Sequence, residues 1–395
     1  MKPLKLASTA AVFFSLLFCQ SAFAQTATAC GGDFATWRAG VVDEARSQGV
    51  SGLGLEALGV ASIDEEVLKK DRSQGVFTLD FLTFSKRLIS QGRIDNGRAN
   101  LKTYAKVFER AQTEFGVSPE IITAFWAFET DYGAVQGDFL TLNAVATLAH
   151  DCRRPELFRP QLIALGKLIA QGIVPPDVKG AWAGEIGQIQ VLPADYLTKG
   201  RDGDGDGAVT LKTSSPDAIM TAANFLSSLG WQANQPWMQE VIVPSQMEWF
   251  DAGLHKRLAV SEWVSRGVSA REGKLHSDLE ASLVLPMGRK GPAFLAYPNF
   301  NVLLEWNQSL TYVLTAAYFG TRLAGAKVYQ AGENHAGLSA DRMKALQSKL
   351  ISQGYNVGKA DGILGAGTRA AVRDLQRKNG LPADGWPTEI LFDYF

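Results

Sequence analysis

A single glutamate, Glu129, stands inside the apolar run IITAFWAFETDYGAVQG at residues 121–137. If this run is a helix, the positions three, four and seven residues before Glu129 are Trp126, Phe125 and Ile122. The carboxylate then shares the face of these apolar side chains. We expect that face to be buried or to line a cleft.

The ends of this helix place Glu129 in its last turn. Ser118 is a good N-cap and Pro119 suits the first helical position, while Gly133 is typical of a stop. An apolar wall and the negative end of the helix dipole both raise the pKa of a carboxyl group. A carboxyl group that is still protonated near neutral pH can act as a general acid. The helix alone leaves open a core glutamate bonded to a backbone group or an arginine.

A second motif, RDGDGDGAVTL at residues 201–211, has the acidic spacing of a calcium loop. Aspartates stand at positions 1, 3 and 5 of an EF-hand-like loop, but position 12 is Thr213 instead of glutamate. Crowded carboxylates repel one another, which favours Ca²⁺ over an empty acidic turn, in a structural role. The predicted ligands are Asp202, Asp204, Asp206, Ala208 through its carbonyl, and Asp217.

A third segment, GAWAGEIGQIQVLPADYL, carries amides among small residues. Its glycines allow close backbone approach to a ligand, and Gln188 and Gln190 could bond the hydroxyl and acetamido groups of a sugar. The segment alone is equally compatible with a glycine-rich connector.

Length and composition indicate an exported globular protein. The chain has 395 residues, 46% of them hydrophobic, and a formal net charge of -1, which gives no indication of nucleic-acid binding. Residues 1–24 have the basic start, apolar centre and Ala-Phe-Ala end of a secretory signal, which predicts the periplasm. No later segment is apolar enough to cross a membrane.

Cysteine use fits the same compartment. Cys19 lies in the signal, but the bulky Phe18 before it disfavours a lipoprotein processing site. Cys30 and Cys152 are left in the mature chain, and two cysteines in an exported protein favour a disulfide over a metal pair. We expect these two to be bonded to each other.

Residues 328–337, VYQAGENHAG, are predicted to be a linker, and residues 338–395 a separate unit. This unit resembles the peptidoglycan-binding domain of bacterial wall enzymes, on the sequence LQSKLISQGYNVGKADGILGAGTRAAVRDLQRKNGLPADGWP. The resemblance implies a small three-helix module that holds the protein on the cell wall.

The preceding segments also stand in a familiar order: FETDYG, LNAVATLAHDCRRPELF, WAGEIGQIQVLPADYL, DGDGDG with DAIMTAANFL, and NFNVLLEWNQSLTY. Over about residues 33–325 the chain resembles the lytic murein transglycosylases of the membrane-bound B type. The resemblance implies a mainly α, lysozyme-like catalytic domain, here residues 25–327, with an EF-hand-like calcium loop. The substrate would be the glycan strands of peptidoglycan, acted on by a monomer without an organic cofactor.

The resemblance also assigns roles to residues. It places the catalytic glutamate at Glu129, the conserved-position glutamine at Gln190, and an aromatic pair at Trp306 and Tyr312, and it repeats the calcium ligands given above. Several departures alter the expected sugar-binding cleft, among them Glu185, which replaces an alanine of close relatives, and Phe225, which replaces a tyrosine.

The implied mechanism uses one carboxyl group twice. Glu129 protonates the oxygen between N-acetylmuramic acid and N-acetylglucosamine, then takes a proton from the muramic 6-hydroxyl, which closes a 1,6-anhydro ring. One alternative is a muramidase in which Glu185 activates water. Another is a wall-binding scaffold whose catalytic cleft has decayed.

Overall fold

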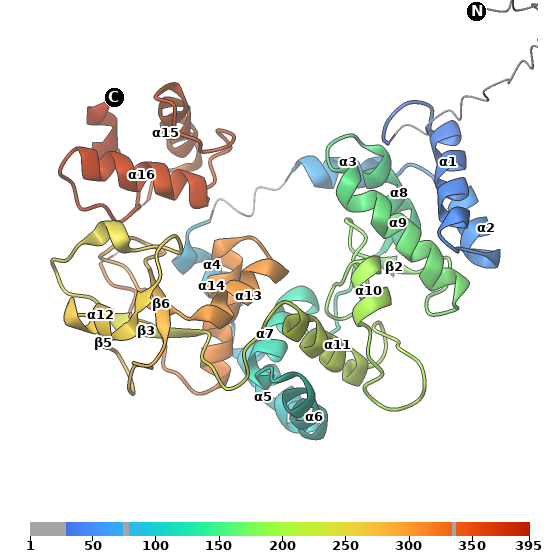
Figure 1. Ribbon diagram of the computed structural model, residues 1–395, viewed down its shortest axis with the longest axis horizontal. Coiled ribbons are helices and arrows are strands. Elements are labelled where there is room, and N and C mark those ends of the chain that lie inside the picture. The colour runs from blue at the N-terminus through green and yellow to red at the C-terminus, as the bar shows by residue number, and fades with distance from the viewer. Residues whose placement is uncertain (1–28, 74–78, 334–336) are drawn as a thin grey trace, which may run out of the picture.

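The computed structural model describes residues 29–73, 79–333 and 337–395. The predicted signal segment, with Cys19, lies outside the described residues. The molecule is mainly helical, as predicted, and elongated, with α1 and α2 near one end and the C-terminal module near the other (Figure 1). No helix in the described ranges is long and apolar enough to cross a membrane.

The first helical group lies at the centre and carries Glu129. Helix α7 begins at Pro119, as predicted, and is buried over most of its length between α5, α11 and α14. Helix α4 packs against α14. The group comprises α4 (Phe81–Leu88), α5 (Gln91–Thr103), α6 (Ala105–Phe115), α7 (Pro119–Thr130), α11 (Ser215–Ser228), α13 (Pro298–Trp306) and α14 (Leu310–Leu323).

The second helical group packs around α9, which contacts α1, α2, α8 and α10. Its members are α1 (Phe34–Ser47), α2 (Gly52–Val60), α3 (Glu65–Arg72), α8 (Thr141–His150), α9 (Pro155–Ala170) and α10 (Pro193–Lys199). Strands β1 (Phe139–Leu140) and β2 (Lys179–Gly180) form a short antiparallel ribbon beside α8. The ribbon precedes the glycine-rich segment that leads to α10.

A five-stranded antiparallel sheet stands between α11 and α13 in the chain. Strands β3 and β6 overlap the β-branched and apolar runs EVIVP and ASLVLP. The strand order is β4-β6-β7-β3-β5, and the sheet has its own core around Trp263 and Tyr297. The elements are β3 (Met238–Ile242), β4 (Leu258–Ala259), α12 (Val260–Ser265), β5 (Ser269–Ala270), β6 (Glu280–Val284) and β7 (Ala293–Ala296), with the 3-10 helix η2 (Trp249–Asp251) between β3 and β4.

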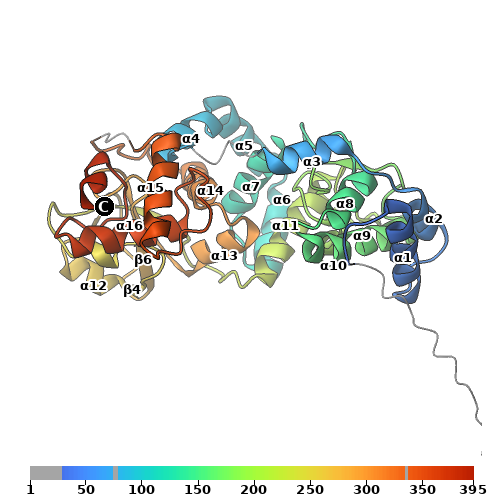
Figure 2. The same cartoon turned by 90° about the horizontal axis from the view of Figure 1, so that it is seen from above.

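The C-terminal module contains α15 (Ala340–Ser352), α16 (Ala366–Lys378) and η3 (Glu389–Tyr394). The third helix is therefore a 3-10 helix, packed through Leu391 on the module's own core. Both views show the module lying over the sheet (Figures 1 and 2). Arg373 on α16 donates to the carbonyl of Ala252, 2.9 Å away, so the module is hydrogen-bonded to the sheet region.

The described part of the predicted linker is packed on the protein. Tyr329 is buried, and its hydroxyl hydrogen-bonds Ser85 at 2.8 Å. The Gln330 amide donates to Glu240, and the Glu333 amide donates to the carbonyl of Lys290. These contacts fix the path of the chain up to residue 333.

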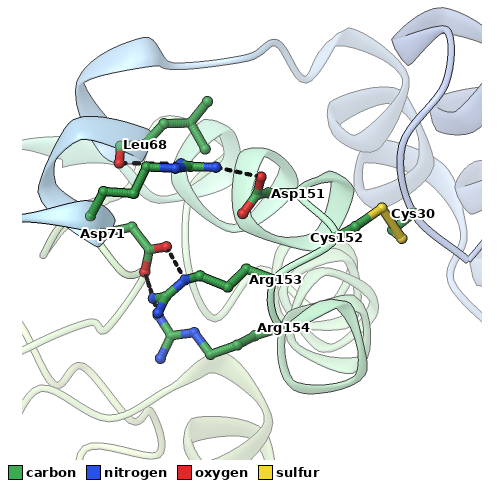
Figure 3. Close-up of polar contacts among 8 residues, drawn as sticks. Cys30, Leu68, Asp71, Asp151, Cys152, Arg153 and Arg154 are labelled. Atoms are coloured by element: carbon green, nitrogen blue, oxygen red, sulfur yellow. Dashed lines mark hydrogen bonds and ion pairs between the residues drawn. A yellow bond between two sulfur atoms is a disulfide. The ribbon is translucent and has the colours of Figure 1, made fainter. Parts of the chain in front are cut away.

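Cys30 and Cys152 form a disulfide, as predicted from the cysteine count. It ties the segment before α1 to the turn between α8 and α9, across a sequence separation of 122 residues (Figure 3). Cross-linking so long a loop restricts the unfolded chain, which stabilises the folded one.

We expect that Cys152→Ser lowers the free energy of unfolding by about 2–4 kcal/mol, because the variant regains the loop entropy that the disulfide removes. Denaturant unfolding of the variant and of the wild-type protein, with and without reductant, measures the loss. Reductant should destabilise only the wild type. Equal stability of both proteins under oxidising conditions would contradict this account.

Candidate active site

Glu129 lies in the last turn of α7, as the sequence predicted. Burial raises the pKa of its carboxyl to about 7, while hydrogen bonds from Tyr312 and Trp306 oppose the rise and the nearby Glu185 adds to it. The dominant cause is the loss of water around the charged form. A carboxyl with this pKa can both give and take a proton near neutral pH.

Both hydrogen bonds to Glu129 reach the same oxygen. The Tyr312 hydroxyl donates to Oε1 at 2.6 Å, and the indole N–H of Trp306 donates to Oε1 at 3.3 Å. Oε2 has no hydrogen bond to any residue within 29–73, 79–333 and 337–395. An oxygen that accepts two hydrogen bonds is a poor place for the proton, so the acidic proton belongs on Oε2.

An aromatic stack holds Trp306 in place. Its ring lies 4.9 Å from that of Phe125 on α7 and 5.0 Å from that of Phe225 on α11, between centroids. These spacings are those of favourable aromatic pairs. Phe225, expected near the sugar-binding cleft, therefore supports the indole that contacts Glu129.

The turn after Glu129 contains a clamp that the sequence analysis missed. Asp131 and Tyr132 have positive φ angles of 51° and 61°, which are costly for residues other than glycine. Arg93 on α5 holds both residues: its Nε donates to Asp131 at 3.0 Å, and its carbonyl accepts from the Tyr132 hydroxyl at 2.6 Å. An arginine in a polar helix gives no sequence signal for this role.

Gln188 contacts α7 and is buried. Its side-chain oxygen accepts from the indole of Trp126 at 3.0 Å and from Ser215 at 3.1 Å. Its backbone carbonyl accepts from the Thr130 hydroxyl at 2.5 Å. The side-chain oxygen expected to bond a sugar is thus committed to the protein, where it fixes α7 against the glycine-rich segment.

Gln190 sits in a tight turn of the same segment, with a φ of 49°. Its side-chain nitrogen donates to the carbonyl of Gly187 at 2.8 Å and to that of Gln136 at 3.3 Å. The isolated bridge between Ile186 and Val191 closes this turn. Gln190 therefore shapes the turn of the glycine-rich segment, and its amide nitrogen is engaged within the protein.

Glu185 is a second half-buried carboxyl in the same region. Burial raises its pKa, and the positive charge of Arg154 opposes that rise. Its Oε2 is buried and has no hydrogen-bond partner among the described residues. The structure therefore brings Glu185 within electrostatic reach of Glu129, as expected from the sequence.

The acidic loop gathers three of the predicted calcium ligands. Carboxylate oxygens of Asp202, Asp204 and Asp217 all lie within 4.8 Å of one another, and Asp217 is buried at the start of α11. Asp206 lies outside this group, and its Oδ1 accepts from the amide of Ala208 at 2.8 Å.

The carboxylate ligands of the acidic loop suit a hard cation. Backbone amides of Gly205 and Gly207 donate to Asp202, and those of Gly203 and Thr210 donate to Asp217. These bonds orient the carboxylates but do not neutralise three negative charges. Clustered carboxylate oxygens on a glycine-rich loop are the ligands that Ca²⁺ prefers.

Known families match both parts of the chain. Residues 33–321 match the transglycosylase SLT domain, and residues 339–392 match a peptidoglycan binding domain. Membrane-bound lytic murein transglycosylase B of Escherichia coli (strain K12) is 29% identical over 252 residues, which are 63% of this chain and 68% of that protein.

Solved structures of lytic transglycosylases are similar to this chain. SltB3 from Pseudomonas aeruginosa, in complex with NAG-anhNAM-pentapeptide, is 34% identical with a TM-score of 0.84, over 92% of this chain and 99% of that one. The Escherichia coli lytic transglycosylase SLT35, in complex with calcium, is 25% identical with a TM-score of 0.63, over 76% of this chain and 97% of that one.

Because the pKa of Glu129 is raised, we expect this residue to lower the free energy of unfolding at high pH. The folded pKa of about 7 exceeds the ordinary 4.5, so the folded protein binds the extra proton and loses stability as the pH rises through this window. Relative to the wild type, Glu129→Gln should gain about 3 kcal/mol in free energy of unfolding between pH 4.5 and 7.5. Denaturant titrations across this range measure the gain.

Tyr312→Phe serves as the companion variant. It removes a hydrogen bond that lowers the Glu129 pKa, so the window should extend to higher pH. A stability difference between wild type and Glu129→Gln that is constant across the range would contradict the raised pKa.

Proposed function

The chain belongs to the transglycosylase SLT domain family, and we propose that, as a lytic transglycosylase of peptidoglycan, it uses Glu129 first as acid and then as base. The bond cleaved joins N-acetylmuramic acid to N-acetylglucosamine. The observation that carries the proposal is the buried carboxyl whose pKa is raised to about 7 and which, within the described part of the chain, is hydrogen-bonded through Oε1 and not Oε2.

In the first step Oε2 of Glu129 gives its proton to the bridging oxygen, and the bond to the anomeric carbon breaks. The acetamido carbonyl of the muramic sugar stabilises the positive charge on that carbon. Tyr312 and Trp306 stabilise the carboxylate that Glu129 becomes, because each donates a hydrogen bond to Oε1.

In the second step the carboxylate takes the proton of the muramic 6-hydroxyl, whose oxygen attacks the anomeric carbon. The product is a 1,6-anhydro ring, and no water is consumed. Ring closure within one bound sugar gains from proximity. Gln190 holds the turn of the glycine-rich segment, and Phe225 supports Trp306.

We further propose the setting of the reaction. Residues 1–24 direct export to the periplasm, residues 25–327 form the catalytic domain, residues 328–337 join it to the module of residues 338–395, and the protein acts as a monomer. The match of residues 339–392 to a peptidoglycan binding domain supports the module's role on the same polymer.

Calcium is proposed as a structural ion of the acidic loop, held by Asp202, Asp204 and Asp217, with Asp206 and Ala208 completing the shell. The distances among the first three carboxylates support this. The ion would neutralise their charge and fix the start of α11, which carries Phe225. No step of the reaction involves it.

The products distinguish the mechanism from its rivals. The protein is incubated with purified peptidoglycan, and the released fragments are analysed by mass spectrometry. We expect fragments ending in 1,6-anhydromuramic acid, and we expect Glu129→Gln to lower the rate by about 10²–10⁴-fold. Reducing ends would instead indicate a muramidase with Glu185 as base, and binding without release would indicate a scaffold.

Calcium binding predicts a metal-dependent stability. Added Ca²⁺ should raise the melting temperature of chelator-treated protein, by an amount equivalent to about 2.7 kcal/mol at a hundredfold excess over the dissociation constant. Asp217→Asn should abolish the rise, because it removes the buried charge of the group. Thermal unfolding with and without chelator is the measurement, and an unchanged melting temperature would exclude a bound structural ion.

A further inference from the structure

Arg93 on α5 places a positive charge beside the two helices that carry Glu129 and Tyr312. Helix α5 packs against α7, whose last turn holds Glu129, and against α14, whose first turn holds Tyr312 (Figure 1). The side chain of Arg93 is 22% exposed, so most of its surface is removed from water. A charge in this position acts more strongly on its neighbours than a fully solvated charge does.

Three contacts hold the guanidinium of Arg93 in one place. Its Nη1 donates to the carbonyl of Leu88 at 2.6 Å, and its Nε donates to Asp131 at 3.0 Å. The guanidinium also lies over the ring of Phe128, with Cζ 5.8 Å from the ring centre, which is the geometry of a cation–π contact. The positive charge therefore has a fixed position relative to α7.

Phe128 is a shared neighbour of Arg93 and Tyr312. Its ring meets the ring of Tyr312 at a steep angle, with 6.0 Å between the two centroids. The hydroxyl of Tyr312 in turn donates to Oε1 of Glu129 at 2.6 Å. An apolar ring screens charge far less than water does, so the guanidinium can act on the phenol across Phe128.

The charge of Arg93 favours a more acidic hydroxyl on Tyr312. Burial raises the pKa of Tyr312 well above its ordinary value, the nearby Glu129 adds to this rise, and Arg93 opposes it. A hydroxyl that a positive charge makes more acidic is also a stronger hydrogen-bond donor.

The counter-charge of Arg93 lies closer to solvent. The side chain of Asp131 is 45% exposed, against 22% for Arg93, so water screens the carboxylate more than the guanidinium. Two other charged groups act in this region. Glu185 of the glycine-rich segment raises the pKa of Glu129, and the positive charge of Arg154 acts on Glu185.

We propose that Arg93 is a positioning residue whose positive charge strengthens the hydrogen bond from Tyr312 to Glu129. This electrostatic role is additional to its hold on the turn after Glu129. The stronger bond favours the carboxylate, and it thereby sets how readily Glu129 gives up its proton. The inference rests on the proposed acid and base roles of Glu129, which it deepens.

The test measures the pH midpoint at which the Glu129 carboxyl ionises, by infrared difference spectroscopy of each protein against its own Glu129→Gln counterpart. Arg93→Gln removes the charge and weakens the donation by Tyr312, so the midpoint should rise by about half a unit. Asp131→Asn removes the counter-charge but keeps an oxygen for Nε and tolerates a positive φ, so the midpoint should fall by a similar amount.

The direction of the two shifts separates a charge effect from a purely structural clamp. If Arg93 only holds the turn, both substitutions loosen the same ion pair and move the midpoint in the same direction or not at all, which would overturn the proposal. Arg93→Lys keeps the charge without the planar fork and should restore most of the wild-type midpoint. If Arg93→Gln does not fold, the fall expected for Asp131→Asn decides the question.

A second background tests the path through the hydroxyl. In Tyr312→Phe, Arg93→Gln should cause no further rise in the midpoint, because the group on which the charge acts is missing. A rise equal to that seen with Tyr312 present would show that Arg93 does not act through this hydrogen bond.

Cleavage of purified peptidoglycan separates this inference from the function. If the midpoints shift as expected while the wild type releases no anhydro product, the proposed reaction is wrong and the role of Arg93 stands. If the wild type releases that product while Arg93→Gln and Asp131→Asn keep the wild-type midpoint, the reaction stands and the charge of Arg93 has no such role.

Discussion

The rest of the site depends on one buried carboxyl group, Glu129, of which Oε1 alone is hydrogen-bonded to the residues that the structure describes. Burial in an apolar helix face keeps Glu129 protonated near neutral pH, and the two donors on Oε1 leave Oε2 to carry the proton. The same donors stabilise the anion once the proton has left. Burial and hydrogen bonding therefore act in opposite directions on the pKa, and their balance lets one group serve as acid and then as base.

Much of the fold serves to bring these groups together. Glu129 and Tyr312 are 183 residues apart in the chain, and their contact requires α7 to pack against α14. Gln188 fixes the far side of α7, and Arg93 holds the left-handed turn that ends it. Strain in that turn is of order 1–3 kcal/mol per residue and persists only because these contacts determine it.

The sequence was sufficient to predict the features that depend on local residue patterns. Helical periodicity and Pro119 placed Glu129 in the last turn of a buried helix, and the aspartate spacing located a loop in which three carboxylates meet. The roles of Trp306 and Tyr312 came from family resemblance, because nothing in their spacing points to Glu129. Their catalytic roles, like that of Glu129, stay predictions.

Other features depend on tertiary contacts that local pattern does not encode. Strands β4 and β5 have two residues each, too few to show alternation. Asp131 and Tyr132 adopt positive φ angles only because Arg93 holds them, and Gln188 looked like a sugar-binding amide until its oxygen was found bonded to Trp126. The contact of Arg373 in the C-terminal module with the carbonyl of Ala252 is likewise invisible in the local sequence pattern.

Infrared difference spectroscopy of the wild-type protein against Glu129→Gln tests the central claim most directly. The band of the protonated carboxyl of Glu129 is followed as the pH rises. The account predicts that this band persists above pH 6 and titrates with a midpoint near 7. Loss of the band with a midpoint near the ordinary value of 4.5 would show that Glu129 is ionised at neutral pH, and the single-carboxyl mechanism would be wrong.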